Sequence, residues 1–228
     1  MNHNIKHVFF DLDHTLWDFD KNSGLTFKKI FQLNAINVKL EDFLSIYEPI
    51  NLRYWKLYRE ERISKENLRY GRLKDAFDAL GVFVEDHMIH RLSVAYIDEL
   101  ASFNYLFDNT FEILDYLKDK YELHIITNGF EEVQERKMVQ SNIIDYFMTI
   151  TNSEMVGVKK PNPKIFNFAL KMADANAHES IMIGDSLEAD IEGADHIGMD
   201  TILFDYKKTH TQSKYKTIHE LIEIKSLL

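Results

Sequence analysis

Two aspartates near the N-terminus, Asp11 and Asp13, have a spacing that suits a shared chemical task. In an extended segment, residues two apart point to the same face, so their carboxylates would repel each other. A divalent cation relieves that repulsion, and oxygen-only ligands suit Mg²⁺. A turn after Asp11 would also relieve it, leaving the Asp13 side chain free for proton transfer while its carbonyl faces the metal. An ordinary loop or helix-capping pair is the remaining interpretation.

A hydroxyl, an amide and a lysine occupy comparable places further along the chain. Thr127 and Asn128 precede a helix-like stretch, and a hydroxyl with backbone N–H groups at a helix start can hold an anion. Lys160 precedes Pro161 in the sequence Lys159-Lys160-Pro161, and either lysine could hold a phosphate as a point charge. A simple helix cap and a solvated lysine pair are the alternatives.

Two more aspartates, Asp185 and Asp190, lie in the segment GDSLEAD. Asp185 follows Gly184 where an apolar run ends. Asp190 is expected beside the helix face that packs on the sheet, where a carboxylate needs a partner such as Lys160 or the metal shell. An exposed helical aspartate is the alternative for Asp190.

Short apolar runs bounded by polar or glycine residues predict the strands that would position these groups. The runs are His7–Phe10, Glu122–Ile126, Tyr146–Ile150, Ser180–Ile183 and Thr201–Phe204. Helical periodicity separates the later runs, with Asn162 and Ser186 as expected N-caps. This alternation predicts an α/β fold with a doubly wound parallel sheet, in which ligands lie beyond the carboxyl ends of the strands.

The alternation stops between Trp17 and Leu106, where only helical patterns occur. The candidate helices are Ser23–Ile36, Leu40–Glu61, Lys65–Leu80 and Glu85–Leu100. We therefore expect a Rossmann-like core of residues 1–16 and 107–228, and an inserted all-helical domain of residues 17–106. A single mixed domain with long helical crossovers is the alternative.

Composition narrows the functional classes. The chain has 228 residues, no Cys and a net charge of −10. The absence of Cys excludes disulfides, thiolate metal sites and a Cys nucleophile. The acidic balance disfavours nucleic acid polymers and anionic membranes as partners. Because no apolar run is long enough for a signal peptide or a membrane span, we expect a cytoplasmic protein.

Taken together, four segments resemble the motifs of the haloacid dehalogenase superfamily. They are DLDHTL from Asp11, ITN from Ile126, KKP from Lys159 and GDSLEAD from Gly184. The helical insert after the first motif resembles that family's type 1 cap.

The resemblance implies a role for each matching position. Asp11 would be the nucleophile that forms an aspartyl-phosphate, and Asp13 the general acid and base. Thr127, Asn128 and Lys160 would bind the phosphoryl group. Asp185 would complete a Mg²⁺ site with the Asp11 side chain and the Asp13 backbone, while Asp190 would orient Lys160 or a metal-bound water.

The same positions discriminate between activities within the family. Dehalogenases lack an acid at the position of Asp13, so that residue implies phosphate chemistry. Phosphomutases usually carry Gly where this chain has His14. A 2-haloacid dehalogenase and a phosphomutase are therefore the less favoured alternatives. A phosphorylated receiver domain and a catalytically silent binding protein are rivals from other classes.

The first motif and RYGR from Arg69 resemble pyrimidine 5′-nucleotidases, which implies a nucleoside monophosphate as substrate. A sugar phosphate or another small phosphorylated metabolite is the alternative substrate. We expect the protein to be a monomer or a weak homo-oligomer.

Arg69 or Arg72 could reach a substrate, although a paired arginine is the commoner case. Aromatic residues of the insert could stack on a base, but helix packing is the more usual role. These are Trp17, Phe19, Tyr47, Tyr54, Trp55, Tyr58 and Phe77.

Overall fold

The computed structural model describes residues 4–210 and 213–228. The chain divides into two compact units. One, the core unit, combines the residues up to Phe19 with Asn104–Leu228, and the other, the helical unit, is Asp20–Phe103. The first boundary lies three residues after the expected one, which places Trp17 and Phe19 in the core unit. The second boundary lies three residues before the expected one.

The core unit contains one parallel sheet with the strand order β3-β2-β1-β4-β5-β6. Its strands are β1 (His7–Phe10), β2 (Glu122–Thr127), β3 (Thr149–Asn152), β4 (Ser180–Gly184), β5 (Asp200–Phe204) and β6 (Thr217–Ile218). The expected doubly wound, Rossmann-like parallel sheet is therefore confirmed.

Two strands differ from the expectation. The third begins at Thr149 rather than Tyr146, because Ile144–Tyr146 forms a 3₁₀ turn (η2) that buries no side chain. The two-residue strand β6 was not predicted, because its length is too short for an alternating pattern to show.

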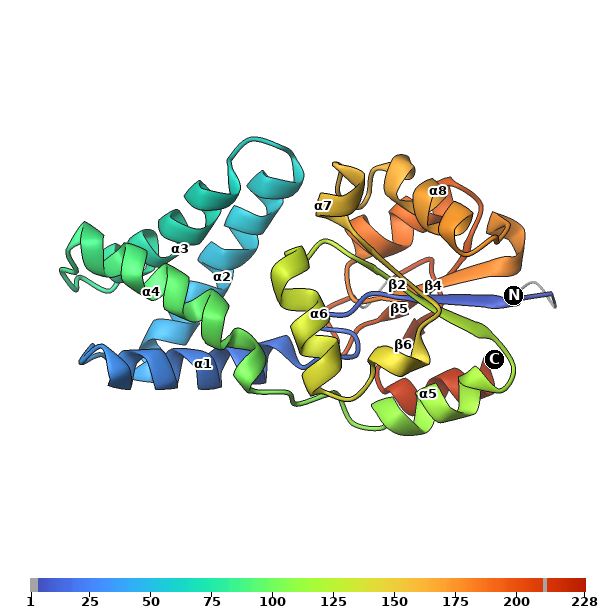
Figure 1. Ribbon diagram of the computed structural model, residues 1–228, viewed down its shortest axis with the longest axis horizontal. Coiled ribbons are helices and arrows are strands. Elements are labelled where there is room, and N and C mark those ends of the chain that lie inside the picture. Colours follow the sequence, from blue (N-terminus) through green and yellow to red (C-terminus); the bar gives the residue numbers. More distant parts are fainter. Residues whose placement is uncertain (1–3, 211–212) are drawn as a thin grey trace. The chain divides into compact units, whose positions relative to one another are not determined.

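Helices cover both faces of the sheet. Figure 1 shows α8 (Pro163–Met172) on one face and α5 (Thr110–Lys118) on the other. The remaining helical segments are α6 (Glu131–Gln140), α7 (Ser153–Val156), α9 (Gly193–His196), η3 (Ala177–Glu179), η4 (Leu187–Glu192) and η5 (Leu221–Ser226). On the α8 face, Phe9 and Ile126 pack with Ile165 and Phe166 in a fully buried core. Both expected N-caps are confirmed: Asn162 accepts from Lys164 N, and Ser186 accepts from Ala189 N.

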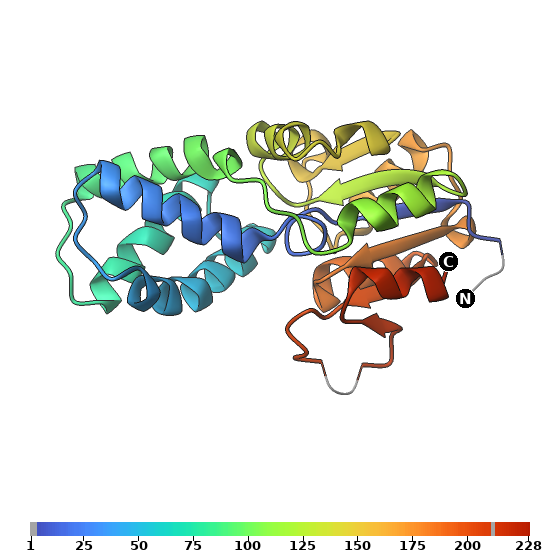
Figure 2. The ribbon, with the colours of Figure 1, turned by 90° about the horizontal axis from the view of Figure 1, so that it is seen from below.

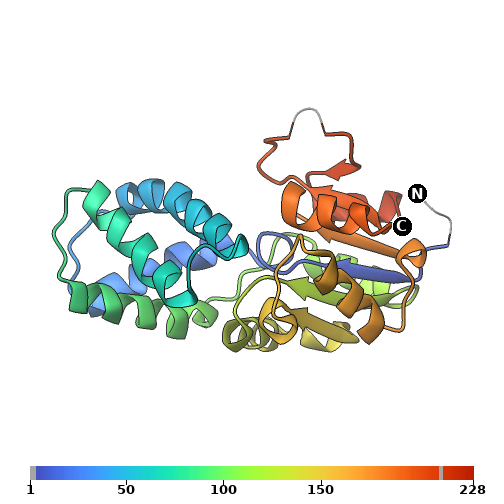
Figure 3. The ribbon, with the colours of Figure 1, turned by 90° about the horizontal axis from the view of Figure 1, so that it is seen from above.

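The helical unit contains four long helices, close to the ranges expected from periodicity (Figures 2 and 3). They are α1 (Phe19–Leu33), α2 (Leu40–Arg59), α3 (Lys65–Ala79) and α4 (Asp86–Glu99), followed by the short turn η1 (Leu100–Ser102). The first residue of α1, Phe19, still belongs to the core unit. Their interior is aromatic, with Phe27 ringed by Phe31, Phe43, Tyr47 and Tyr96.

Across the described residues, we find no helix with the length and apolarity needed to cross a membrane.

Candidate active site

The carboxyl ends of the three central strands bring the predicted residues together. β1 lies between β2 and β4, and Phe10 pairs with both Ile125 and Ile183. The Asp11 N–H continues this ladder by donating to Ile183 O at 2.9 Å. Asp11 is thereby held beside the end of β4, where Asp185 begins the next loop.

Lys160 reaches this point from the loop before α8. Its ammonium group donates to Asp11 Oδ1 at 2.7 Å and to Ile126 O at 2.6 Å, and it pairs with Asp190 Oδ1 at 2.6 Å. The side chain is 2% exposed. Burial opposes the charged lysine, but the adjacent Asp11 and Asp190 outweigh it and raise the pKa of Lys160. Lys160 is therefore a fully charged, fully partnered ammonium.

Asp190 is held in place by backbone features of the fourth motif. Its Oδ2 accepts from Ser186 N at 3.0 Å, and its position depends on Gly184. A Cβ at Gly184 would lie 2.3 Å from the Asp190 carboxylate. Since real contacts of that length do not occur, only glycine at position 184 lets Asp190 approach the strand end.

Asp11, Asp185 and Asp190 form a compact acidic cluster whose ligand atoms all lie within 4.8 Å of one another. Burial raises the pKa of Asp11 to about 7, against the opposing effect of Lys160. Burial, followed by the charges of Asp190 and Asp11, raises the pKa of Asp185 well above its usual range. Three carboxylates face one lysine, so the site lacks positive charge. A divalent cation with oxygen ligands fits this donor set.

The Asp13 side chain has different partners from Asp11. The chain turns immediately after Asp11, because Leu12 O accepts from both Leu16 N and Trp17 N. Asp13 then receives hydrogen bonds from Lys137 Nζ at 2.5 Å and Gln134 Nε2 at 3.1 Å. The turn considered in the sequence analysis is therefore present, and it gives the two carboxylates different partners.

Lys137 and Gln134 were not singled out in the sequence. Both lie on α6 and are 2% exposed. Lys137 Nζ is also 4.2 Å from the centre of the Trp17 ring, which favours the cation. The sequence shows that these two residues are three apart, and therefore on one helical face, and that a helix begins directly after the second motif. The sequence does not show that they contact Asp13.

Thr127 and Asn128 act within this network in different ways. The Thr127 hydroxyl oxygen accepts from Gln134 Nε2 at 2.7 Å and from Gly129 N at 3.1 Å. The Asn128 side chain donates to Lys160 O at 3.0 Å and accepts from Lys160 N at 2.8 Å. Both ends of the Asn128 amide therefore hold the loop that carries Lys160.

The residues considered for substrate contacts are divided between the two units. Trp17 and Phe19 are buried in the core unit, so their assignment to the inserted domain was wrong. In the helical unit Tyr47, Tyr58 and Phe77 are buried, as expected for packing residues, while Tyr54 and Trp55 are half-buried. Arg72 is 2% exposed and donates to Asn51 Oδ1 at 2.9 Å, so it is a paired structural arginine.

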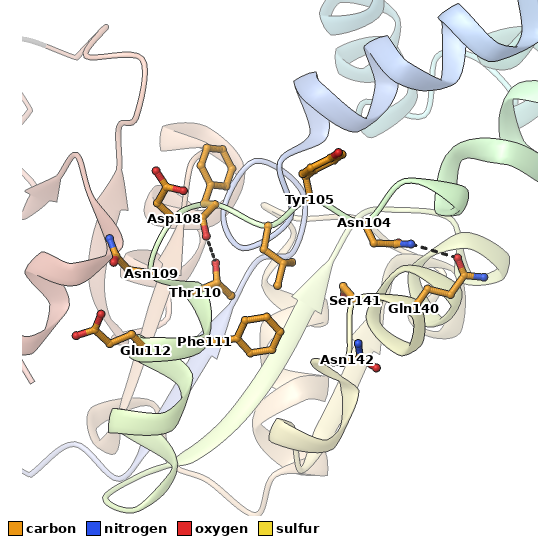
Figure 4. A pocket seen from close by; sticks show the side chains of 12 residues that line it. Asn104, Tyr105, Asp108, Asn109, Thr110, Phe111, Glu112, Gln140, Ser141 and Asn142 are labelled. Atoms are coloured by element: carbon orange, nitrogen blue, oxygen red, sulfur yellow. Dashed lines mark hydrogen bonds between the residues drawn. The ribbon is translucent and has the colours of Figure 1, made fainter.

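A pocket of about 480 Å³ lies elsewhere on the core unit, between the segment before α5 and the end of α6 (Figure 4). Asn104 and Thr110 belong to its lining, and Asn104 donates to Gln140 across one edge. None of the residues predicted to do chemistry lines it. The chemistry is therefore to be sought at the strand ends.

The acidic cluster and Lys160 lie at the carboxyl edge of a parallel α/β sheet, which is where α/β enzymes of this kind bind their ligands. A sequence model of the haloacid dehalogenase-like hydrolases matches residues 8–204. The chain belongs to this family.

Two curated relatives share about a third of the sequence. Pyrimidine 5′-nucleotidase YjjG of Escherichia coli is 32% identical over 85% of this chain and 83% of the relative. A glyceraldehyde 3-phosphate phosphatase of Pyrococcus abyssi is 34% identical over 90% and 83%.

Among solved structures, the HAD-hydrolase YfnB of Bacillus subtilis superposes with a TM-score of 0.88, at 25% identity and 99% coverage of both chains. That crystal structure contains bound magnesium.

Proposed function

We propose that this enzyme is a Mg²⁺-dependent phosphatase of small phosphate monoesters, and that its substrates are nucleoside 5′-monophosphates. The observation that carries the proposal is the cluster of Asp11, Asp185 and Asp190 beside Lys160, in which Asp185 is half-buried and the other three residues are buried. Its unbalanced negative charge suits a divalent cation, and a cation with Lys160 suits a phosphoryl dianion.

In this proposal the Asp11 and Asp185 carboxylates, with the Asp13 backbone carbonyl, hold the metal. When bound, Mg²⁺ supplies positive charge that offsets the charge of the phosphoryl oxygens. Asp190 orients Lys160, since its two oxygens are engaged by Lys160 Nζ and Ser186 N. Thr127, the Asn128 backbone and Lys160 bind the phosphoryl oxygens.

The side chains carry out the chemistry in two steps. A carboxylate oxygen of Asp11 bonds to phosphorus as the ester P–O bond breaks, and Asp13 gives its proton to the leaving alkoxide. A water molecule then attacks the aspartyl-phosphate while Asp13 takes its proton, which releases phosphate and restores both aspartates. Lys137 and Gln134 position Asp13 in both steps.

A direct test of the nucleophile is Asp11→Asn, which we expect to abolish turnover of p-nitrophenyl phosphate with Mg²⁺ present. Asp115→Asn is the matched control, because Asp115 is an exposed aspartate on α5 paired with Lys118. Retained activity in Asp11→Asn would remove the mechanism.

The substrate is tested by comparing kcat/KM on a panel of phosphorylated metabolites. The panel contains nucleotides and a triose phosphate, because these are the substrate classes named for the two curated relatives. We expect nucleoside 5′-monophosphates to be hydrolysed fastest. Turnover of glyceraldehyde 3-phosphate with none of any nucleotide would refute the nucleotidase assignment and leave the phosphatase assignment standing.

A further inference from the structure

A second group of metal-ligating side chains lies at the amino ends of the strands. His7 begins β1, and Glu122 begins β2 with His124 two residues later. His7 pairs with Glu122 and Phe9 pairs with His124, so the three side chains share one face of the sheet. Asp11 is four residue steps beyond His7 along the extended chain, a distance of about 13 Å. This group is therefore distinct from the acidic cluster.

The distances within the group match a tetrahedral ion. His7 Nδ1 lies 3.3 Å from His124 Nε2 and 3.7 Å from Glu122 Oε2, and all three ligand atoms lie within 4.8 Å of one another. A tetrahedral Zn²⁺ with Zn–N bonds of about 2.0–2.1 Å holds two nitrogens about 3.3–3.4 Å apart. The Glu122 side chain is 58% exposed, so its carboxylate can adjust at little cost.

The protonation and orientation of His124 also suit a ligand. Burial, with a smaller effect of His7, lowers the pKa of His124 to about 4, so its ring is neutral at pH 7. Its Nδ1 lies 2.9 Å from Thr149 Oγ1 on the neighbouring strand. Ligating histidines are typically oriented by such a bond through their other ring nitrogen, which here leaves Nε2 facing His7.

We propose that His7, Glu122 and His124 bind one zinc-class divalent ion that joins β1 to β2 at their amino ends. Two imidazoles and one carboxylate favour Zn²⁺, Co²⁺ or Ni²⁺ over Mg²⁺, which prefers oxygen ligands. The exposed side of Glu122 leaves a fourth position for water. The ion would connect strands that the whole inserted unit separates along the chain, so its role is to stabilise the fold.

The test is zinc binding by calorimetry, with thermal unfolding as an independent readout, on untagged protein in saturating Mg²⁺. All proteins carry His3→Ala, because His3 lies outside the described residues and offers another imidazole. We expect one Zn²⁺ equivalent to bind and to raise Tm. Glu122→Gln and His7→Gln each weaken binding at least about tenfold, and Thr149→Val weakens it about 10–100-fold through the orientation of His124.

Two controls separate this site from others. Asp185→Asn removes a carboxylate of the acidic cluster and leaves zinc binding unchanged. His87→Gln removes an exposed imidazole on α4 that lies 2.9 Å from Glu85, outside the proposed site, and it also changes nothing. Glu122→Gln keeps its activity with Mg²⁺, which shows that it folds.

The proposal is overturned if no zinc equivalent binds in saturating Mg²⁺, or if binding is the same in Glu122→Gln and His7→Gln as in the parent protein. In the first case His7 and His124 would simply form a hydrogen-bonded pair. Because Mg²⁺-dependent turnover is measured separately, failure here is distinguishable from failure of the proposed phosphatase activity.

Discussion

At the scale of single residues, the site assigns different partners to two aspartates that lie two positions apart. Asp11 contacts Lys160 within the acidic cluster, whereas Asp13 contacts Lys137 and Gln134 on α6. In the proposed mechanism, the attacking aspartate must be close to the metal, and the aspartate that exchanges protons must be held at the leaving group. The separation of their partners fits both proposed roles.

Lys137 offers a way to test the role of Asp13. Replacing Lys137 by Met removes one of the two side chains that hold the Asp13 carboxylate, and we expect kcat to fall about 10–100-fold, since small misplacements at a reacting centre cost that much. The loss is larger for an alkyl phosphate than for p-nitrophenyl phosphate, because only the poor leaving group needs a proton. Steady-state kinetics on both substrates measure it.

Two variants control this experiment. Asp13→Asn shows the same dependence on the leaving group, and Lys137→Arg recovers part of the rate. Equal losses on the two substrates in Lys137→Met would indicate a structural role alone.

Gly184 gives a second prediction at this scale. Gly184→Ala places a methyl group where Asp190 lies, so Asp190 and then Lys160 must move. We expect at least about a tenfold lower kcat/KM and a loss of stability of about 1–3 kcal/mol, typical of overpacking. Gly24→Ala in α1 is the control, since its nearest neighbour is the flexible end of Leu44 at 3.3 Å. Unchanged kinetics in Gly184→Ala would show that the close approach of Asp190 to residue 184 is not needed for activity.

At the scale of elements, the site depends on how loops from different strands hold one another. The Asn128 amide holds the backbone of Lys160 from both sides, which couples the end of β2 to the loop before α8.

In the helical unit, a polar group lies inside an aromatic core. Arg72 lies 4.9 Å from the Tyr96 ring centre, and the Tyr96 hydroxyl lies 2.8 Å from Ser23 Oγ.

That buried tyrosine predicts a loss of stability at alkaline pH. Burial, with the nearby Tyr47, raises the pKa of Tyr96 well above 10 despite the opposing effect of Arg72. Above about pH 10 the unfolded chain releases the tyrosine proton while the folded chain keeps it, so the free energy of unfolding falls as pH rises. Tyr96→Phe should make this decline shallower in urea titrations followed by circular dichroism.

The control is Tyr105→Phe, which changes an exposed tyrosine of the core unit. It leaves the alkaline slope unaltered. An identical slope in Tyr96→Phe and the parent protein would show that ionisation of Tyr96 is not responsible.

At the scale of the whole molecule, the proposed metal at the acidic cluster would couple stability to metal binding. The three carboxylates come from the ends of β1 and β4 and from η4, and Lys160 pairs with two of them, Asp11 and Asp190. Their mutual repulsion disfavours the folded chain unless a cation is bound.

Removal of the metal should therefore lower Tm at pH 7, and saturating Mg²⁺ should restore it, because binding to the folded state alone stabilises that state. Differential scanning calorimetry with and without chelator measures this. Asp185→Asn weakens the repulsion among the carboxylates of the cluster, and it also removes most of the rise in Tm that Mg²⁺ causes. A Tm that does not respond to Mg²⁺ in the parent protein would argue against a metal at this cluster.

Much of the fold was predictable because it depends on local pattern. Apolar runs at His7–Phe10 and Ser180–Ile183 predicted buried parallel strands, and Asn162 and Ser186 predicted helix starts. The start of β3 was misplaced because the apolar Tyr146 and Phe147 continue the pattern of a strand through a 3₁₀ turn. Periodicity alone does not separate these two.

The sequence by itself determined which chemistry-bearing residues lie at the strand ends, because strand ends follow from local hydrophobic pattern and Asp11, Thr127 and Asp185 occupy them. Only the tertiary structure decided their partners. Lys137 is far from Asp13 along the chain, as His7 is from His124, and such contacts depend on how helices and strands pack in space. The spacing of residues within one segment does not predict contacts between residues that are far apart along the chain.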